Sequence, residues 1–180
     1  MDWNFDNEVS ALENLYGLIF YFMARETVDT FGKEGEEAVK RAMAKYGAYR
    51  GGLLRKEHEK KGIEINVKNL FEHYDLPQDP RTNRKRFVLN ETEKISEYYS
   101  CQFAEMWQML DGTQEGSPIG ALYCEAFHPA MYAGYDPRIS LNLPKTFTYG
   151  DDCCRFEVKM QLDPEKETPA QKEKDEKTNP

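Results

Sequence analysis

Apolar residues recur at helical spacing through the first half of the chain. Residues three and four positions apart share one face of an α-helix, so this spacing predicts amphipathic helices. The first stripe consists of Val9, Leu12, Leu15, Tyr16, Ile19, Phe20 and Met23. Asp6 or Asn7 is placed to cap this helix, and Gly32 breaks it. A second helix is predicted from about Glu34 to Lys61, with an inner face of Ala38, Val39, Ala42, Met43, Tyr46, Tyr49, Leu53 and Leu54.

Three glycines interrupt the second predicted helix, namely Gly47, Gly51 and Gly52. Each glycine in a helix interior costs roughly 1 kcal/mol relative to alanine, so a compensating reason is expected. The glycines therefore indicate close approach of either another helix or a ligand.

The pattern changes to extended segments after a short helix predicted around Val67 to Tyr74. Strands are predicted at 86–90, 94–99, 139–143 and 153–162, with helices at 102–110 and 118–132 between them. This order predicts an α+β fold, with N-terminal helices packed on a roughly four-stranded antiparallel sheet. Residues 1–162 are expected to form a single domain. Residues 163–180, which are charged and lack large apolar side chains, are expected to be a disordered tail.

The net charge of -8 argues against nucleic-acid binding, because a protein that binds the phosphate backbone needs a basic face. One basic cluster runs against this trend and contains Arg81, Arg84, Lys85 and Arg86. This cluster either attracts an anion or is a solvated loop that leads into a strand.

The sequence indicates no membrane association. The most apolar run, Leu15 to Met23, is too short to span a bilayer. Acidic residues stand where a secretory signal needs basic ones, so a cytoplasmic location is expected. Trp3, Phe5 and the apolar stripe offer area for a homo-oligomer that forms through the N-terminal helix.

Cys124 and His128 are the first candidates for chemistry. They lie four residues apart on a predicted helix and therefore share a face. An imidazole at that spacing can accept the thiol proton and create a thiolate nucleophile, and the same pair can bind one divalent metal ion. The alternative is that Cys124 is a small core residue and His128 a hydrogen-bonded core histidine.

A second cluster lies at the last predicted strand, where Gly150, Asp151 and Asp152 form a turn. Cys154 shares strand parity with Phe156 and Val158, so Cys154 is predicted to point inward and Cys153 outward. Adjacent cysteines that project to opposite sides do not suggest a disulfide framework. If this strand packs under the Cys124 helix, Cys124, His128, Cys154 and Asp151 converge. They would form a catalytic site or a Cys/His/Asp metal site, which Cys101 could join, although no C-x-x-C or H-E-x-x-H motif is present.

Three segments carry a family resemblance. The first is Phe31-Gly32-Lys33-Glu34-Gly35-Glu36-Glu37-Ala38, which continues through Tyr46-Gly47 and Arg50-Gly51. The others are Tyr123-Cys124 ahead of Tyr135-Asp136-Pro137, and Gly150-Asp151-Asp152-Cys153-Cys154-Arg155-Phe156. In this order they resemble the L-2-amino-thiazoline-4-carboxylic acid hydrolase family, from about Phe31 to Gln161. The chain departs from the family's middle motif, which we associate with an aspartate, by having His128.

The resemblance implies a hydrolase that opens a small cyclic amidine or amide-like ring, such as the aminothiazoline ring, to give an N-carbamoyl cysteine. Under this hypothesis Cys124 is the nucleophile or a metal ligand, His128 the base and Asp151 the orienting group. Cys154 is then a second ligand or a pocket wall, and the substrate contacts are Tyr98, Tyr123 and Glu125. The chain is also distantly similar to vinyl-reductase-associated domains. The second hypothesis is therefore a non-catalytic sensory domain that binds a small molecule or a metal in a Tyr/Phe-lined pocket.

Overall fold

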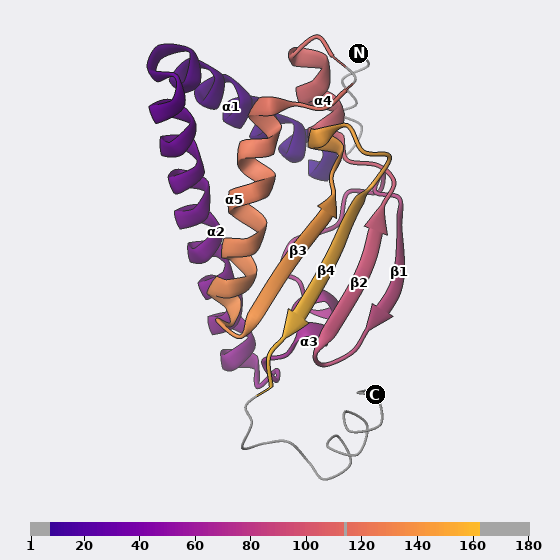
Figure 1. Cartoon of the computed structure of the whole chain (residues 1–180). Coiled ribbons are helices and arrows are strands. Elements are labelled where there is room, and N and C mark those ends of the chain that lie inside the picture. Colours follow the sequence, from indigo (N-terminus) through magenta and orange to yellow (C-terminus); the bar gives the residue numbers. More distant parts are fainter. Residues whose placement is uncertain (1–7, 114, 163–180) are drawn as a thin grey trace, which may run out of the picture.

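The computed structural model describes residues 8–113 and 115–162. In chain order the helices are α1 (Glu8–Phe31), α2 (Lys33–Lys61), α3 (Val67–Glu72), α4 (Gln102–Leu110), α5 (Pro118–Tyr135) and the 3-10 turn η1 (Phe147–Tyr149). The strands are β1 (Arg84–Leu89), β2 (Glu93–Tyr98), β3 (Ile139–Lys145) and β4 (Cys154–Met160). They form one antiparallel sheet in the order β1-β2-β4-β3 (Figure 1). The predicted α+β fold is confirmed, whereas the expectations for residues 1–7 and 163–180 lie outside the described residues.

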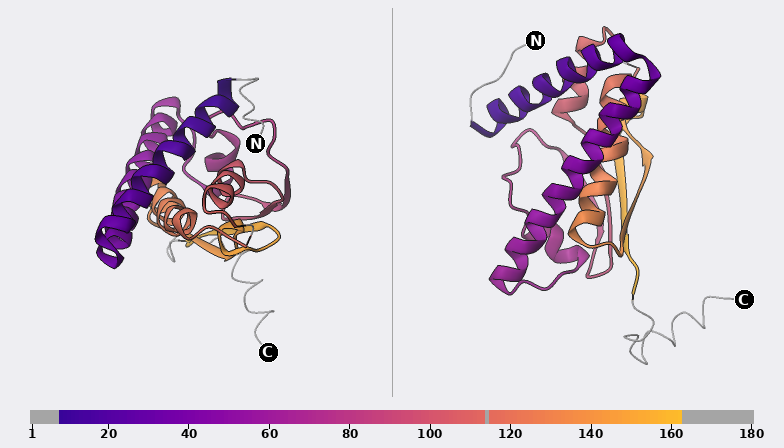
Figure 2. Two further views of the ribbon diagram at one scale, coloured as in Figure 1. Left: turned by 90° about the horizontal axis from the view of Figure 1, so that it is seen from above. Right: turned by 90° about the vertical axis from the view of Figure 1, so that its left-hand side faces the viewer.

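The helices cover one face of the sheet in two layers. Helix α5 lies next to the sheet, and α2 packs on the far side of α5 (Figures 1 and 2). On β4 the side chains of Cys154, Phe156 and Val158 share the face toward α5, because alternate residues of a strand point the same way. We call this face of the sheet the inner face.

The contact between α2 and α5 explains two of the three α2 glycines. A side-chain carbon at Gly51 would meet the carbonyl oxygen of Met131 and lie 2.6 Å from the amide nitrogen of Tyr135. At Gly47 it would meet the carbonyl oxygen of Phe127. The close approach expected at these glycines is therefore that of another helix, not of a ligand.

This packing gives a prediction with an internal control. Gly51→Ala is expected to destabilise the protein by about 1–3 kcal/mol, because the methyl group cannot fit against the α5 backbone. Gly52→Ala is expected to stabilise it by up to about 1 kcal/mol, since the nearest atom is 3.9 Å away and alanine favours the helix. Urea unfolding of the two variants measures both changes. Equal effects of the two substitutions would show that the helices are not in backbone contact.

The apolar stripe of α1 correctly predicts the helix but only part of its buried face. Leu12, Leu15, Ile19 and Met23 are between 55% and 67% exposed. Of the stripe, Phe20 is buried and Tyr16 packs partly buried against the core. The other buried positions of α1 are Ser10, Asn14, Gly17, Tyr21 and Ala24. The expectation for α2 is met in part: Val39 and Leu54 are buried as expected, whereas Tyr49 is 66% exposed and the buried positions include Gly47 and Gly51. Small residues let these helices approach their neighbours closely, and the large apolar residues are displaced to the surface.

The exposed stripe leaves the expected self-association through α1 as a prediction. None of the helices within residues 8–113 and 115–162 combines the length and the apolar character that crossing a bilayer requires.

Candidate functional site

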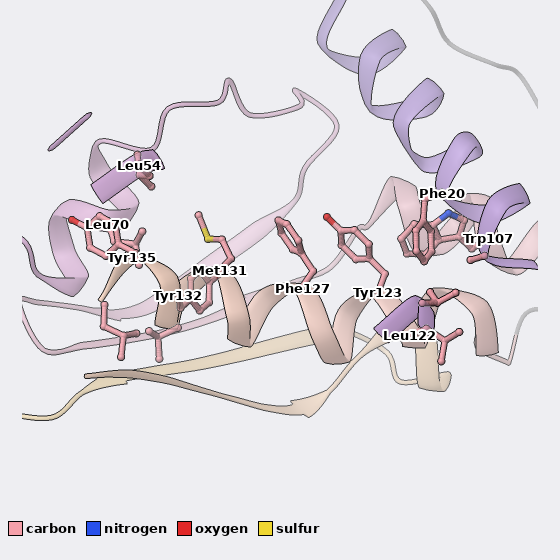
Figure 3. Packing of buried hydrophobic residues seen from close by; sticks show 14 of the residues in the cluster. Phe20, Leu54, Leu70, Trp107, Leu122, Tyr123, Phe127, Met131, Tyr132 and Tyr135 are labelled. Atoms are coloured by element: carbon pink, nitrogen blue, oxygen red, sulfur yellow. The ribbon is translucent and has the colours of Figure 1, made fainter. Parts of the chain in front are cut away.

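A cavity of about 470 Å³ lies between α5, the inner face of the sheet, α3, α4 and the segment 74–82. This volume falls within the range of small-molecule binding sites. Aromatic side chains form most of the α5 wall, among them Tyr123, Phe127 and Tyr132. Figure 3 shows Tyr123, Phe127 and Met131 projecting in a row from one face of α5.

Three of the four predicted catalytic residues border this single cavity. They are Cys124 and His128 from α5, and Cys154 from β4. The predicted substrate contacts Tyr98 and Tyr123 border it as well. The last strand and the α5 helix therefore meet as the strand parity and helix spacing predicted, while the roles of these residues stay predictions.

The other predicted residues do not border the cavity. The carboxylate of Asp151 accepts a hydrogen bond from the backbone nitrogen of Thr146 at 2.8 Å. Glu125 forms an ion pair with Lys40 at 2.7 Å on the outer side of α5. Cys153 points away from the cavity as expected, yet its side chain is buried rather than solvent-exposed. These residues can influence a ligand only through others.

Asp151 does connect to the site through the turn that follows β3. Its hydrogen bond fixes Thr146, whose hydroxyl lies 3.0 Å from that of Thr148. The Thr148 hydroxyl in turn lies close enough to the thiol of Cys124 to lower the pKa of that thiol slightly against the effect of burial. The same turn donates the Phe147 backbone N–H to the sulfur of Cys154 at 3.3 Å. Asp151 therefore holds the turn that positions two thiols, rather than orienting the imidazole of His128.

The two thiols are protonated at neutral pH. Burial raises the pKa of Cys154 to about 12 and that of Cys124 well above its ordinary value. Among the described residues, no hydrogen bond joins the Cys124 thiol to His128. The free protein therefore holds a neutral thiol here and not a thiolate–imidazolium pair.

His128 is a neutral imidazole in a ring of aromatic groups. Burial, followed by the positive charge of Lys94, lowers its pKa to about 4. Its ring centroid lies 5.1 Å from that of Phe156 and 5.4 Å from that of Phe127, both in edge-on contacts. A neutral imidazole that borders a cavity can accept a proton from a bound molecule.

The described residues do not support the metal alternative. Within residues 8–113 and 115–162, no group of three or more His, Cys, Asp or Glu side chains is placed to hold a metal ion. Cys124, His128 and Cys154 border one cavity but do not form a ligand set.

The cavity also has acidic residues that the sequence did not reveal. Glu13 borders it from α1, and burial, followed by the nearby charge of Asp79, raises the pKa of Glu13 to about 7. Asp79 itself is buried and paired with Arg81 at 2.6 Å. Glu13 shares the helix face of Gly17 and Phe20, at spacings of four and seven residues. Only knowledge that this face is buried could have identified it.

Cys101 was expected at a strand-to-helix junction, and the structure confirms that position. It is the N-cap residue of α4, and its side chain makes no capping hydrogen bond. Burial raises the pKa of this thiol to about 11. Cys101 borders the cavity and becomes its third protonated thiol.

Comparison with known proteins places the chain in a family. No curated protein matches it. A similar solved structure is a trafficking protein particle complex subunit 3 from Naegleria fowleri, covalently bound to palmitic acid. The TM-score is 0.52 at 15% identity, covering 82% of this chain and 94% of that chain, so the likeness concerns the fold alone. A family model matches residues 13–158, which include α5, the sheet and the cavity. The chain therefore belongs to the L-2-amino-thiazoline-4-carboxylic acid hydrolase family.

Proposed function

We propose that this protein is a hydrolase that opens a small cyclic amidine or amide-like ring in the cavity beside α5. Membership of the family indicates a hydrolase. The observation that carries the proposal is the neutral imidazole of His128 in a small-molecule cavity of about 470 Å³. The family's name suggests 2-aminothiazoline-4-carboxylate as the first substrate to test.

The proposed reaction needs only water and a proton acceptor. Water adds to the ring carbon between sulfur and nitrogen, which forms a C–O bond and places a proton on the ring nitrogen. The carbon–sulfur bond then breaks, and the sulfur leaves with the electron pair and takes a proton. His128 accepts a proton from the attacking water and returns one to the sulfur. The product is an N-carbamoyl cysteine with a free thiol.

The pKa values of the cavity thiols favour water as the nucleophile. A nucleophilic cysteine must lose its proton, and burial opposes that loss at Cys124. Cys124 and Cys154 act as walls that hold the ring against His128, with the tyrosines Tyr98 and Tyr123 as further contacts.

The direct test is incubation of the purified protein with 2-aminothiazoline-4-carboxylate. A thiol-reactive dye counts the released thiols, and mass spectrometry identifies the product as the substrate plus one water. Release of thiol at a rate proportional to protein concentration supports the proposal. Absence of the ring-opened product at every protein concentration would reject this substrate and the proposed reaction.

Cys124→Ala separates the water route from covalent catalysis. Under the water route its turnover is expected to stay within about tenfold of wild type, because only a wall contact is lost. Cys153→Ala is the matched control, since this thiol is buried nearby without bordering the cavity. Loss of all turnover in Cys124→Ala, with a covalent adduct on the wild-type protein in intact-mass spectra, would establish Cys124 as the nucleophile instead.

The second candidate function is non-catalytic binding of a small apolar molecule. The mainly aromatic cavity wall favours it, and the structurally similar protein from Naegleria fowleri holds palmitic acid covalently. Saturable binding of an aromatic or fatty-acid probe, without turnover of any cyclic amidine, would favour this function over hydrolysis.

A further inference from the structure

A row of basic and polar residues lies on the inner face of the sheet, at its β1–β2 side. In the strand register Arg86 of β1 stands opposite Ser96 of β2, and Arg84 stands opposite Tyr98. Lys94 lies two residues before Ser96 and shares its face. Arg84 and Tyr98 border the cavity described above, and Lys94 and Ser96 continue the same face behind them.

Lys94 is fully buried without an acidic partner. Its side chain has no exposed surface, and within the described residues no carboxylate forms an ion pair with it. Its nitrogen lies 3.9 Å from the ring centroid of Phe71 and 5.3 Å from those of Tyr98 and Phe156. These three rings all border the cavity. The amine is therefore separated from the cavity only by aromatic side chains.

The charges around Lys94 make its burial more costly. Burial, followed by the positive charges of Arg86 and Arg84, lowers its pKa to about 7. Cation–π contacts with the surrounding rings recover only part of the hydration that a buried ammonium loses. A negative group at this position would compensate the rest.

The Lys94 amine donates a hydrogen bond to the Tyr98 hydroxyl at 3.4 Å, but two other polar groups on the same sheet face lack partners. Among the described residues, the hydroxyl of Ser96 and the Nε of Arg86 are buried without a hydrogen-bond partner. Ser96 is fully buried. Buried polar atoms in native proteins are almost always paired, so unpaired donors on the sheet face that continues from the cavity-lining Arg84 and Tyr98 indicate a ligand that supplies acceptors.

We propose that Arg84, Arg86, Lys94 and Ser96 form a subsite that binds the carboxylate of the substrate. The subsite rests on the proposed function, since the carboxylate that it binds is the one attached to the ring of the proposed substrate. The acidic residues that border the cavity do not oppose it. Asp79 is paired with Arg81, and Glu72 is exposed to solvent. Burial, followed by the nearby charge of Asp79, raises the pKa of Glu13 to about 7, which favours its uncharged form.

The subsite also explains how a weakly basic histidine can act on the substrate. The charge of Lys94 reaches His128 and lowers its pKa. A carboxylate held in the subsite offsets that charge and places the attached ring beside His128. Substrate binding therefore makes the imidazole a stronger base than it is in the empty cavity.

The test uses two aromatic analogues whose rings resist hydrolysis, 2-aminothiazole-4-carboxylate and 2-aminothiazole. Isothermal titration calorimetry on the full chain is expected to show that wild type binds the carboxylate at least about tenfold more tightly, the effect of one hydrogen bond to a charged group. Lys94→Met is expected to lose that preference. Lys159→Met on the same sheet is expected to keep it, because that side chain is 69% exposed.

Lys94→Met is expected to fold, because methionine replaces a buried amine that has no acidic partner with an apolar side chain of similar length, at the loss of one 3.4 Å hydrogen bond to the Tyr98 hydroxyl. Ser96→Ala provides a second variant and is expected to reduce the preference about fivefold. Equal binding of both analogues to wild type, or an unchanged preference in both variants, would overturn the subsite even if ring opening occurs. Conversely, selective carboxylate binding without any turnover would reject the hydrolase and leave the subsite standing.

Discussion

Replacement of His128 by asparagine is expected to lower kcat for ring opening by about 10²- to 10⁴-fold, the usual contribution of a general base. Asparagine keeps a polar group of similar reach but cannot accept the proton of the attacking water. The fold should persist, because His128 is only half-buried and contacts its neighbours edge-on through aromatic rings.

The pH profile gives this prediction a second readout. His128 acts in its neutral form, and its pKa in the free protein is about 4. For wild type, kcat/KM is therefore expected to be insensitive to His128 ionisation near neutral pH and to fall as pH drops toward 4. This fall in kcat/KM at low pH should be absent from the His128→Asn variant. His73→Asn is the matched control, since the His73 side chain is exposed. A His128→Asn variant with wild-type kcat would remove His128 from the reaction.

Trp107→Ala is expected to destabilise the protein by about 3–5 kcal/mol, the range for deleting a large aromatic side chain from a core. Trp107 is fully buried, and its ring centroid lies 5.2 Å from that of Phe20 and 5.3 Å from that of Phe103. Its indole nitrogen donates a hydrogen bond to the carbonyl oxygen of Gly17 at 2.9 Å. Alanine leaves a void and an unpaired carbonyl where α1 meets α4.

Urea unfolding monitored by circular dichroism measures this loss. Met109→Ala is the control on the same helix, where a side chain that is 44% exposed should change the free energy of unfolding by less than about 1 kcal/mol. If the two variants unfolded at the same urea concentration, the indole would not be what fixes α1 to the core.

The sequence predicted the helices, the strands and the orientation of Cys154 because each follows from local periodicity. Cys124 and His128 share a helix face by spacing alone, and parity alone points Cys154 toward that helix. The meeting of these elements required only that the last strand lie under α5. These predictions hold in the folded protein because only one face of the sheet is covered by helices, so alternate residues of a strand all point toward that face.

Local periodicity failed where the partner element decides which side is buried. In β2 the alternation of Lys94 and Ile95 suggests a buried isoleucine, yet Lys94 is fully buried and Ile95 is not. Pairing of Lys94 with Val158 of β4 places it on the inner face. In α1, Gly17 lies against Phe103 and Met106 of α4, which turns Glu13 inward and the leucines outward. Neither outcome is encoded within the segment itself.

The glycine contact between α2 and α5 determines which wall of the cavity can yield to a ligand. Backbone touches backbone at Gly51, and Gly134 of α5 meets the backbone of Ala48 in the same way. The helix that carries Cys124 and His128 consequently has no room to retreat, since close-packed interiors are barely compressible. The opposite wall, residues 73–83, contains neither helix nor strand. Residues 73–83 can therefore shift to accommodate ligands of different size, while α5 holds Cys124 and His128 in fixed positions.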